Sequence, residues 1–81
     1  LDRALSLDPL SVHALTNRGI AYVNKGDMSR ALADFDAALQ LAPDDAGLYG
    51  FRSGARRRAG DEAGAKADEA KMAELQLGTG Q

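Results

Sequence analysis

The chain repeats part of its own sequence at an interval of 34 residues. The pair Gly26 and Asp27 recurs as Gly60 and Asp61, and the string ALSLDP near the start recurs at the same interval as ALQLAP. The stretch KGDMSRALADFDAALQLAP therefore belongs to one repeated unit. The end of this unit also occurs earlier in the chain, and an altered copy, AGDEAGAKADEAKMAELQL, follows later. A fixed period of this length predicts a stack of similar structural units.

Each unit has the pattern of two helices. In the central copy apolar residues recur at helical spacing, and they are Ala31, Leu32, Phe35, Ala38 and Leu39. Glycine and proline between such stretches predict four helices, over residues 11–25, 28–41, 45–59 and 62–77. The candidate N-cap residues are Ser11, Asp27 and Asp45. No stretch alternates as a strand does, and the connections are short, so we expect an all-α fold of antiparallel helix hairpins.

Six positions of the central copy, counted from Val12, carry small, aromatic and proline residues at fixed spacing. They are Gly19, Tyr22, Ala31, Phe35, Ala38 and Pro43. This arrangement and the period resemble the tetratricopeptide repeat. The resemblance implies hairpins stacked as a right-handed α-α superhelix, and a scaffold for protein–protein contacts. Arg18 stands where the family often has leucine, a departure expected to be harmless.

The repeat divides the chain into four parts. Residues 1–10 are expected to be the remnant of the second helix of a preceding repeat, and residues 11–44 a complete repeat. Residues 45–77 form a degenerate repeat that ends in a capping helix, and residues 78–81 a tail. The second copy departs more because the outer face of a terminal repeat meets water. We expect the chain to be the C-terminal fragment of a longer array.

Composition argues against catalysis. The chain has no cysteine and a single histidine, His13, with no second ligand at helical spacing. Acidic pairs at residues 44–45 and 61–62 suit helix starts, and Asp34 and Asp36 are expected to be solvated. No phosphate-binding loop is present. We therefore predict no enzyme, no cofactor and no metal. The abundance of Ala, Gly, Asp and Arg favours a bacterial source.

The basic run Arg56, Arg57 and Arg58 has two interpretations. It can grip a carboxylate or phosphate, or it can be a solvated helix end favoured by the helix dipole. The net charge of −2 and the lack of interleaved aromatic residues argue against nucleic acid, and no apolar run is long enough for a membrane helix.

The resemblance implies a peptide-binding groove. In this family the first helix of each repeat lines a concave face that holds a protein or peptide. The positions carried over are His13, Thr16, Asn17, Ile20, Val23, Asn24, Phe51, Arg57 and Arg58. Gly47 and Phe51 stand where chaperone-binding members need basic residues, so binding of chaperone tails is not predicted. Two alternatives remain: homo-oligomers formed through exposed repeat faces, and a structural cap within a larger enzyme or regulatory protein.

Overall fold

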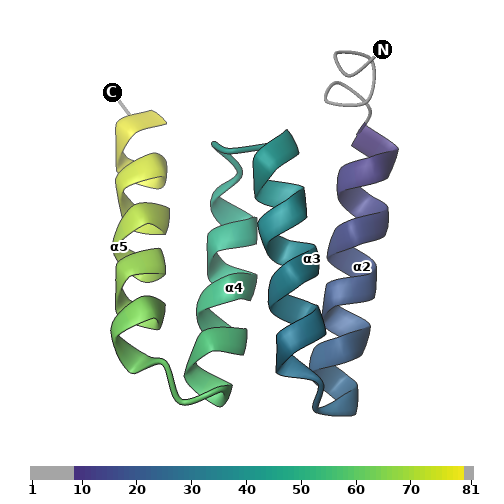
Figure 1. Cartoon of the computed structure of the whole chain (residues 1–81). Coiled ribbons are helices and arrows are strands. Elements are labelled where there is room, and N and C mark those ends of the chain that lie inside the picture. Colours follow the sequence, from purple (N-terminus) through teal and green to yellow (C-terminus); the bar gives the residue numbers. More distant parts are fainter. Residues whose placement is uncertain (1–8, 80–81) are drawn as a thin grey trace.

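The computed structural model describes residues 9–79, with side chains for 11–77, and it contains four helices and no strand within that range. The helices are α2 (Pro9–Lys25), α3 (Met28–Leu41), α4 (Ala46–Arg58) and α5 (Glu62–Thr79). Figure 1 shows neighbouring helices running in opposite directions, joined by short turns. The predicted all-α fold of helix hairpins is confirmed.

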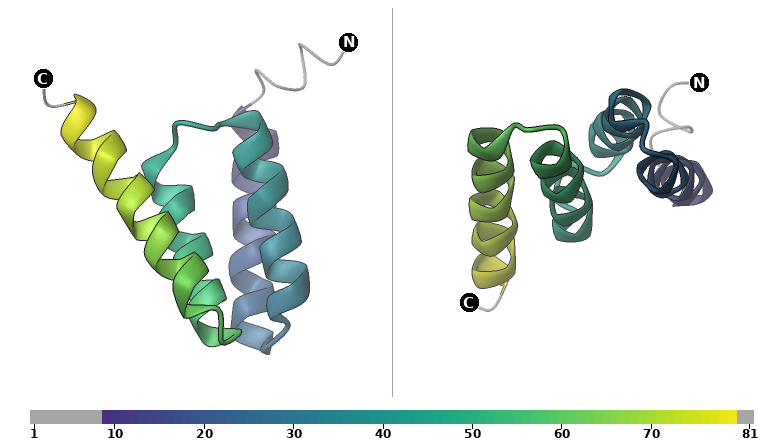
Figure 2. Two further views of the ribbon diagram at one scale, coloured as in Figure 1. Left: turned by 60° about the vertical axis from the view of Figure 1, so that its left-hand side comes forward. Right: turned by 90° about the horizontal axis from the view of Figure 1, so that it is seen from below.

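The helices form a single layer. α2 packs against α3 and α4 against α5, and contacts between α3 and α4 join the two hairpins. The described part of the molecule measures 36 × 33 × 15 Å, so the layer is about one helix and its side chains thick. The view from below in Figure 2 shows the four helices following one another in a row. A layer of this kind has two open faces, each available to a partner.

The helix ends use the predicted turn residues. Gly26 and Gly60 have positive φ values of 85° and 92°, a conformation that favours glycine. The Asp27 side chain accepts a hydrogen bond from the N–H of Arg30, and Asp45 accepts one from Gly47. Both aspartates are therefore N-caps, as the sequence predicts.

Two predicted boundaries are wrong. Ser11 is not an N-cap, because α2 begins at Pro9. Proline is well suited to the first turn of a helix, since its fixed φ is helical and it lacks an N–H that would go unpaired. The expected tail is also too long, because α5 continues to Thr79. The predicted remnant of a preceding helix lies mostly outside the described residues, and the division into repeats stays a prediction.

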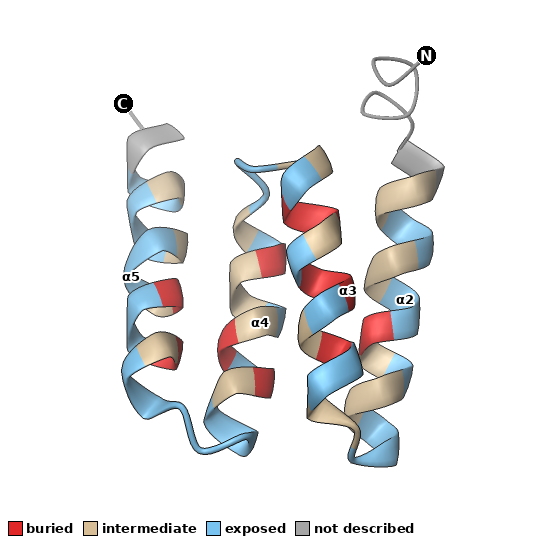
Figure 3. Cartoon of the chain, in the orientation of Figure 1, coloured by how far each residue is buried: buried red, intermediate tan, exposed pale blue. Residues whose placement is uncertain are grey.

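Two small clusters make up most of the core among the described residues, and Ala65 on α5 is buried outside them. Ala31, Phe35 and Ala55 form one, and the second contains Ala38, Leu39 and Leu48. Figure 3 shows the buried positions concentrated on the sides of the helices that face a neighbour. Both clusters draw residues from α3 and α4, so they fasten the two hairpins to each other.

Gly19 permits the close approach of α2 and α3. A Cβ atom at this position would lie 2.6 Å from Cε1 of Phe35, whose ring is almost completely buried. The small residue on α2 and the large one on α3 are therefore complementary in size.

Candidate functional site

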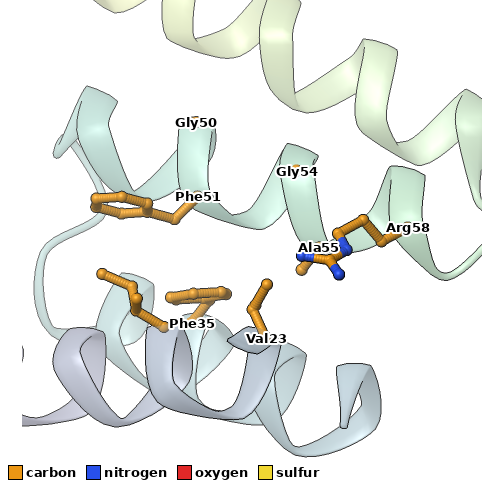
Figure 4. Close-up of a pocket in the computed structure, with 8 residues that line it drawn as sticks. Val23, Phe35, Gly50, Phe51, Gly54, Ala55 and Arg58 are labelled. Atoms are coloured by element: carbon orange, nitrogen blue, oxygen red, sulfur yellow. The ribbon is translucent and has the colours of Figure 1, made fainter. Parts of the chain in front are cut away.

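An open pocket lies between α4 and the α2–α3 hairpin. It has a volume of about 290 Å³, and its walls are Ile20, Val23, Phe35, Gly50, Phe51, Gly54, Ala55 and Arg58. Figure 4 shows Phe51 on α4 facing Phe35 and Val23 on the opposite wall. All but one of the lining side chains are apolar or absent, so the pocket suits a hydrophobic group with one charged neighbour.

Two stacked aromatic rings form one end of the pocket. The ring centroids of Phe35 and Phe51 are 5.9 Å apart and their planes differ by 16°. Phe35 is 1% exposed and anchors the ring pair in the core, whereas Phe51 is 45% exposed. The flanking residues Gly50 and Gly54 have no side chains that could cover the Phe51 ring. A large apolar surface is therefore held in a fixed position and open to solvent.

The three consecutive arginines make different contacts. Arg56 donates to the Asp68 carboxylate at 3.1 Å. Arg57 donates to Glu69 at 2.8 Å and to Glu62 at 3.0 Å, and the hydrogen bond with Glu69 is the main reason that the pKa of Arg57 is raised. For Arg58 no ion pair is found anywhere in residues 9–79. The run thus supplies one cation to the pocket and uses the other two to hold α5.

The structure brings four of the nine predicted groove residues to this pocket. They are Ile20, Val23, Phe51 and Arg58. Arg57 faces α5 instead, because both of its carboxylate partners lie on that helix.

The other four predicted groove residues lie on α2 and line no part of the pocket. His13, Asn17 and Asn24 are exposed, and the Thr16 hydroxyl donates to the Val12 carbonyl oxygen at 2.7 Å. Positions 13, 16, 17 and 20 are neighbours on one face of a helix, so these side chains continue the surface that Ile20 begins. The groove as a ligand site stays a prediction.

Sequence reasoning missed an ion pair in each hairpin that joins an arginine to a buried aspartate. Asp34 is not solvated as expected: it is 5% exposed and accepts hydrogen bonds from Arg18 at 2.9 and 2.8 Å. In the second hairpin Arg52 binds Asp68 in the same way, at 3.0 and 2.8 Å. The signal was present in the sequence, since the arginine and the aspartate both recur at the 34-residue interval.

A second hollow, of about 560 Å³, opens between α3 and α4. Its lining residues are Asp36, Leu39, Gln40, Pro43, Tyr49, Arg52 and Arg56. Its two arginines already pair with aspartates of the chain. A charged ligand here would have to displace those partners, so this hollow is the weaker candidate.

Metal binding and membrane spanning find no support in the described residues. Within residues 9–79 there is no group of three or more His, Cys, Asp or Glu side chains placed to hold a metal ion. None of the helices described has the length and apolar character needed to cross a membrane.

The chain matches the family described as tetratricopeptide repeat over residues 1–73. It is 42% identical over 67 residues to Tetratricopeptide repeat protein 36 of Homo sapiens, an alignment that covers 83% of this chain and 35% of that protein. The mouse protein of the same name is 40% identical over 67 residues, with 83% and 36% covered. Tetratricopeptide repeat protein 14 of Mus musculus is 40% identical over 42 residues, which is 52% of this chain and 6% of that protein.

The chain thus spans about a third of the first relative's length. The three relatives named are mammalian, and the predicted bacterial source stays a prediction.

Proposed function

The chain belongs to the tetratricopeptide repeat family, whose repeats are in general protein-interaction modules, and we propose that it binds a peptide segment of a partner protein on the face formed by α2 and α4. The proposal rests on one observation: Phe51 is 45% exposed on the wall of an open apolar pocket. A ligand side chain that covers this ring removes apolar surface from water, at about 25 cal/mol for each Å².

The proposed mechanism is binding without turnover. The pocket takes an apolar side chain, and the exposed amides of Asn17 and Asn24 offer donors and acceptors to the peptide backbone. Helices α2 and α4 hold these groups in place before the ligand arrives, which lowers the entropic cost of association. Members of the family are typically non-catalytic scaffolds, which agrees with this mechanism.

A peptide-display selection tests the proposal. The 81-residue chain is used as bait beside the variants Phe51→Ala and Asn17→Ala, with Lys66→Ala on α5 as a control away from the pocket. We expect a common motif that the control retains, that Phe51→Ala loses and that Asn17→Ala weakens. Circular dichroism confirms that each variant keeps its helices. The absence of any motif, or a motif indifferent to Phe51→Ala, would contradict the proposal.

Self-association through exposed repeat faces is the alternative, and it stays a prediction. Leu15 and Tyr22 pack against the two core clusters, so charge introduced there would disturb folding as well as any interface. Leu77 is 70% exposed near the end of α5 and is the better residue to change. Light scattering at several concentrations tests this alternative by measuring the molecular mass. Self-association gives a mass that rises with concentration and that is lower in Leu77→Glu.

A further inference from the structure

We infer that the pocket selects a peptide in which an apolar side chain is followed or preceded closely by a carboxylate, and that Arg58 is the residue that recognises this acid. The inference rests on the proposed function and deepens it. Phe51 would bind the apolar group. Arg58 would make the pocket prefer those apolar peptides that also carry a carboxylate.

The first argument is the charge that remains unpaired. Arg56 and Arg57 are neighbours of Arg58 in sequence, and each donates hydrogen bonds to acidic side chains of α5. Arg58 lines the pocket instead, with no ion pair in the part of the chain that is described. A guanidinium has five N–H donors in a planar fork that matches a carboxylate. The chain's own carboxylates pair with Arg56 and Arg57. An acidic ligand would therefore supply the carboxylate that Arg58 lacks.

The second argument is the surroundings of that charge. The other lining residues are apolar side chains and glycines, so no carboxylate of the lining competes for Arg58. A ligand that fills the pocket excludes water from this region, and a charge pair strengthens as the local dielectric falls. An apolar group and a carboxylate in the same ligand would therefore reinforce each other.

The spacing of the two groups follows from the geometry of α4. Phe51 and Arg58 are separated by about 10 Å along the helix axis at 1.5 Å per residue. Figure 4 shows the Arg58 side chain reaching back along the pocket toward Ala55, which shortens the gap. An extended peptide advances about 3.3 Å per residue. We therefore place the carboxylate about two residues from the apolar side chain.

A carboxylate fits this pocket better than a phosphate. A phosphorylated side chain carries close to two negative charges and is usually held by several arginines. Here the neighbouring Arg57 is occupied by Glu62 and Glu69. The carboxylate can belong to an aspartate or glutamate side chain or to the C-terminus of the partner, and the experiment separates these sources.

The test uses synthetic peptides on a neutral glycine–serine frame with one leucine. The first peptide carries aspartate two residues after the leucine and an amidated C-terminus. The second has asparagine in place of the aspartate, the third has asparagine and ends two residues after the leucine with a free carboxylate, and the fourth has phosphoserine. Dissociation constants are measured against the 81-residue chain by NMR titration, with the variants Arg58→Glu, Phe51→Ala and Lys66→Glu. Lys66→Glu makes the same change in net charge on α5.

We expect the aspartate peptide to bind about tenfold more tightly than the asparagine peptide, as for a charge-assisted hydrogen bond. Arg58→Glu should abolish or reverse this preference, whereas Lys66→Glu should keep it. Tighter binding of the third peptide than of the second would assign the preference to a chain terminus. Equal binding of the aspartate and asparagine peptides, with loss of both in Phe51→Ala, would overturn the role of Arg58 and leave the proposed function standing. Preference for phosphoserine would also overturn it. No binding of any peptide, or binding indifferent to Phe51→Ala, would overturn both.

Discussion

Arg52 holds the buried carboxylate of Asp68 through two parallel hydrogen bonds, of 3.0 and 2.8 Å. The remaining nitrogen of the same guanidinium, Nη1, donates to Asp36 on α3 at 2.8 Å. One side chain on α4 therefore joins its own hairpin to the preceding one. The contact repeats within the first hairpin, where Arg18 binds Asp34 in the same two-bond geometry. This two-bond ion pair thus follows the 34-residue period.

Replacing Arg52 should cost more stability than replacing Arg18. The Arg52 side chain is 17% exposed and bridges two carboxylates, whereas the Arg18 side chain is 62% exposed and binds one. Arg52→Met removes the two-bond partner of the buried Asp68 carboxylate, which keeps only its contact with Arg56, and losing one partner of a buried pair costs about 3 kcal/mol. We expect Arg52→Met to lose about this much in urea unfolding and Arg18→Met clearly less.

The double variant Arg52→Met with Asp68→Leu is the control for this explanation. It removes both charges and fills the space with apolar groups, so it should be more stable than Arg52→Met alone. A double variant that is no more stable than the single one would contradict the explanation, because the loss would then come from packing of the arginine stem.

Two glycines should respond to alanine in opposite directions. The Cβ of Gly19→Ala would lie 2.6 Å from the Phe35 ring, and overpacking of this kind costs about 1–3 kcal/mol. The Cβ of Gly54→Ala would meet no atom within 4 Å, so the higher helix propensity of alanine should stabilise α4 by up to about 1 kcal/mol. Thermal unfolding followed by circular dichroism measures both. Because the clash is with one ring, Phe35→Leu in the Gly19→Ala background should recover part of the loss.

The sequence predicts the helices well because their signals are local. Asp27 and Asp45 cap α3 and α4 through contacts only two or three residues away. The burial of Asp34 was missed because its partner lies 16 residues away on the antiparallel helix. An isolated aspartate in a helix looks solvated unless the neighbouring helix is placed beside it.

Which residue of the run Arg56 to Arg58 contacts α5 and which lines the pocket also could not be predicted from the sequence. Successive residues in a helix point about 100° apart, so adjacent arginines must face different neighbours. Which of them turns toward the acids of α5 depends on how α4 is rotated within the layer. The structure assigns Arg57 to Glu69 and Arg58 to the pocket. The sequence-based prediction placed both arginines in the groove. A sequence gives the spacing of residues along a helix, but the rotation of the helix about its axis depends on how it packs.

The turn between α4 and α5 should depend on glycine. Gly60 has a φ of 92°, a conformation in which a side chain clashes with its own backbone. We expect Gly60→Ala to reduce the free energy of unfolding by about 1 kcal/mol, and Gly60→Asn to reduce it less, because asparagine tolerates this conformation better. Urea unfolding of the two variants measures the difference. An alanine variant as stable as the asparagine variant would mean that the turn adopts another conformation.

Acid should weaken the contact between α4 and α5. The hydrogen bond from Arg57 is the main reason that the pKa of Glu69 lies below its ordinary value of 4.5. A carboxyl whose pKa is lower in the folded chain than in the unfolded chain stabilises folding above the unfolded pKa. That contribution disappears as the pH falls through the folded pKa. An NMR titration of the Glu69 side-chain carboxyl should give a pKa below 4.5 that rises in Arg57→Gln. A pKa of Glu69 unchanged by this substitution would mean that Arg57 does not bind Glu69 in solution. The contact between these two residues would then make no contribution to the pH dependence of stability.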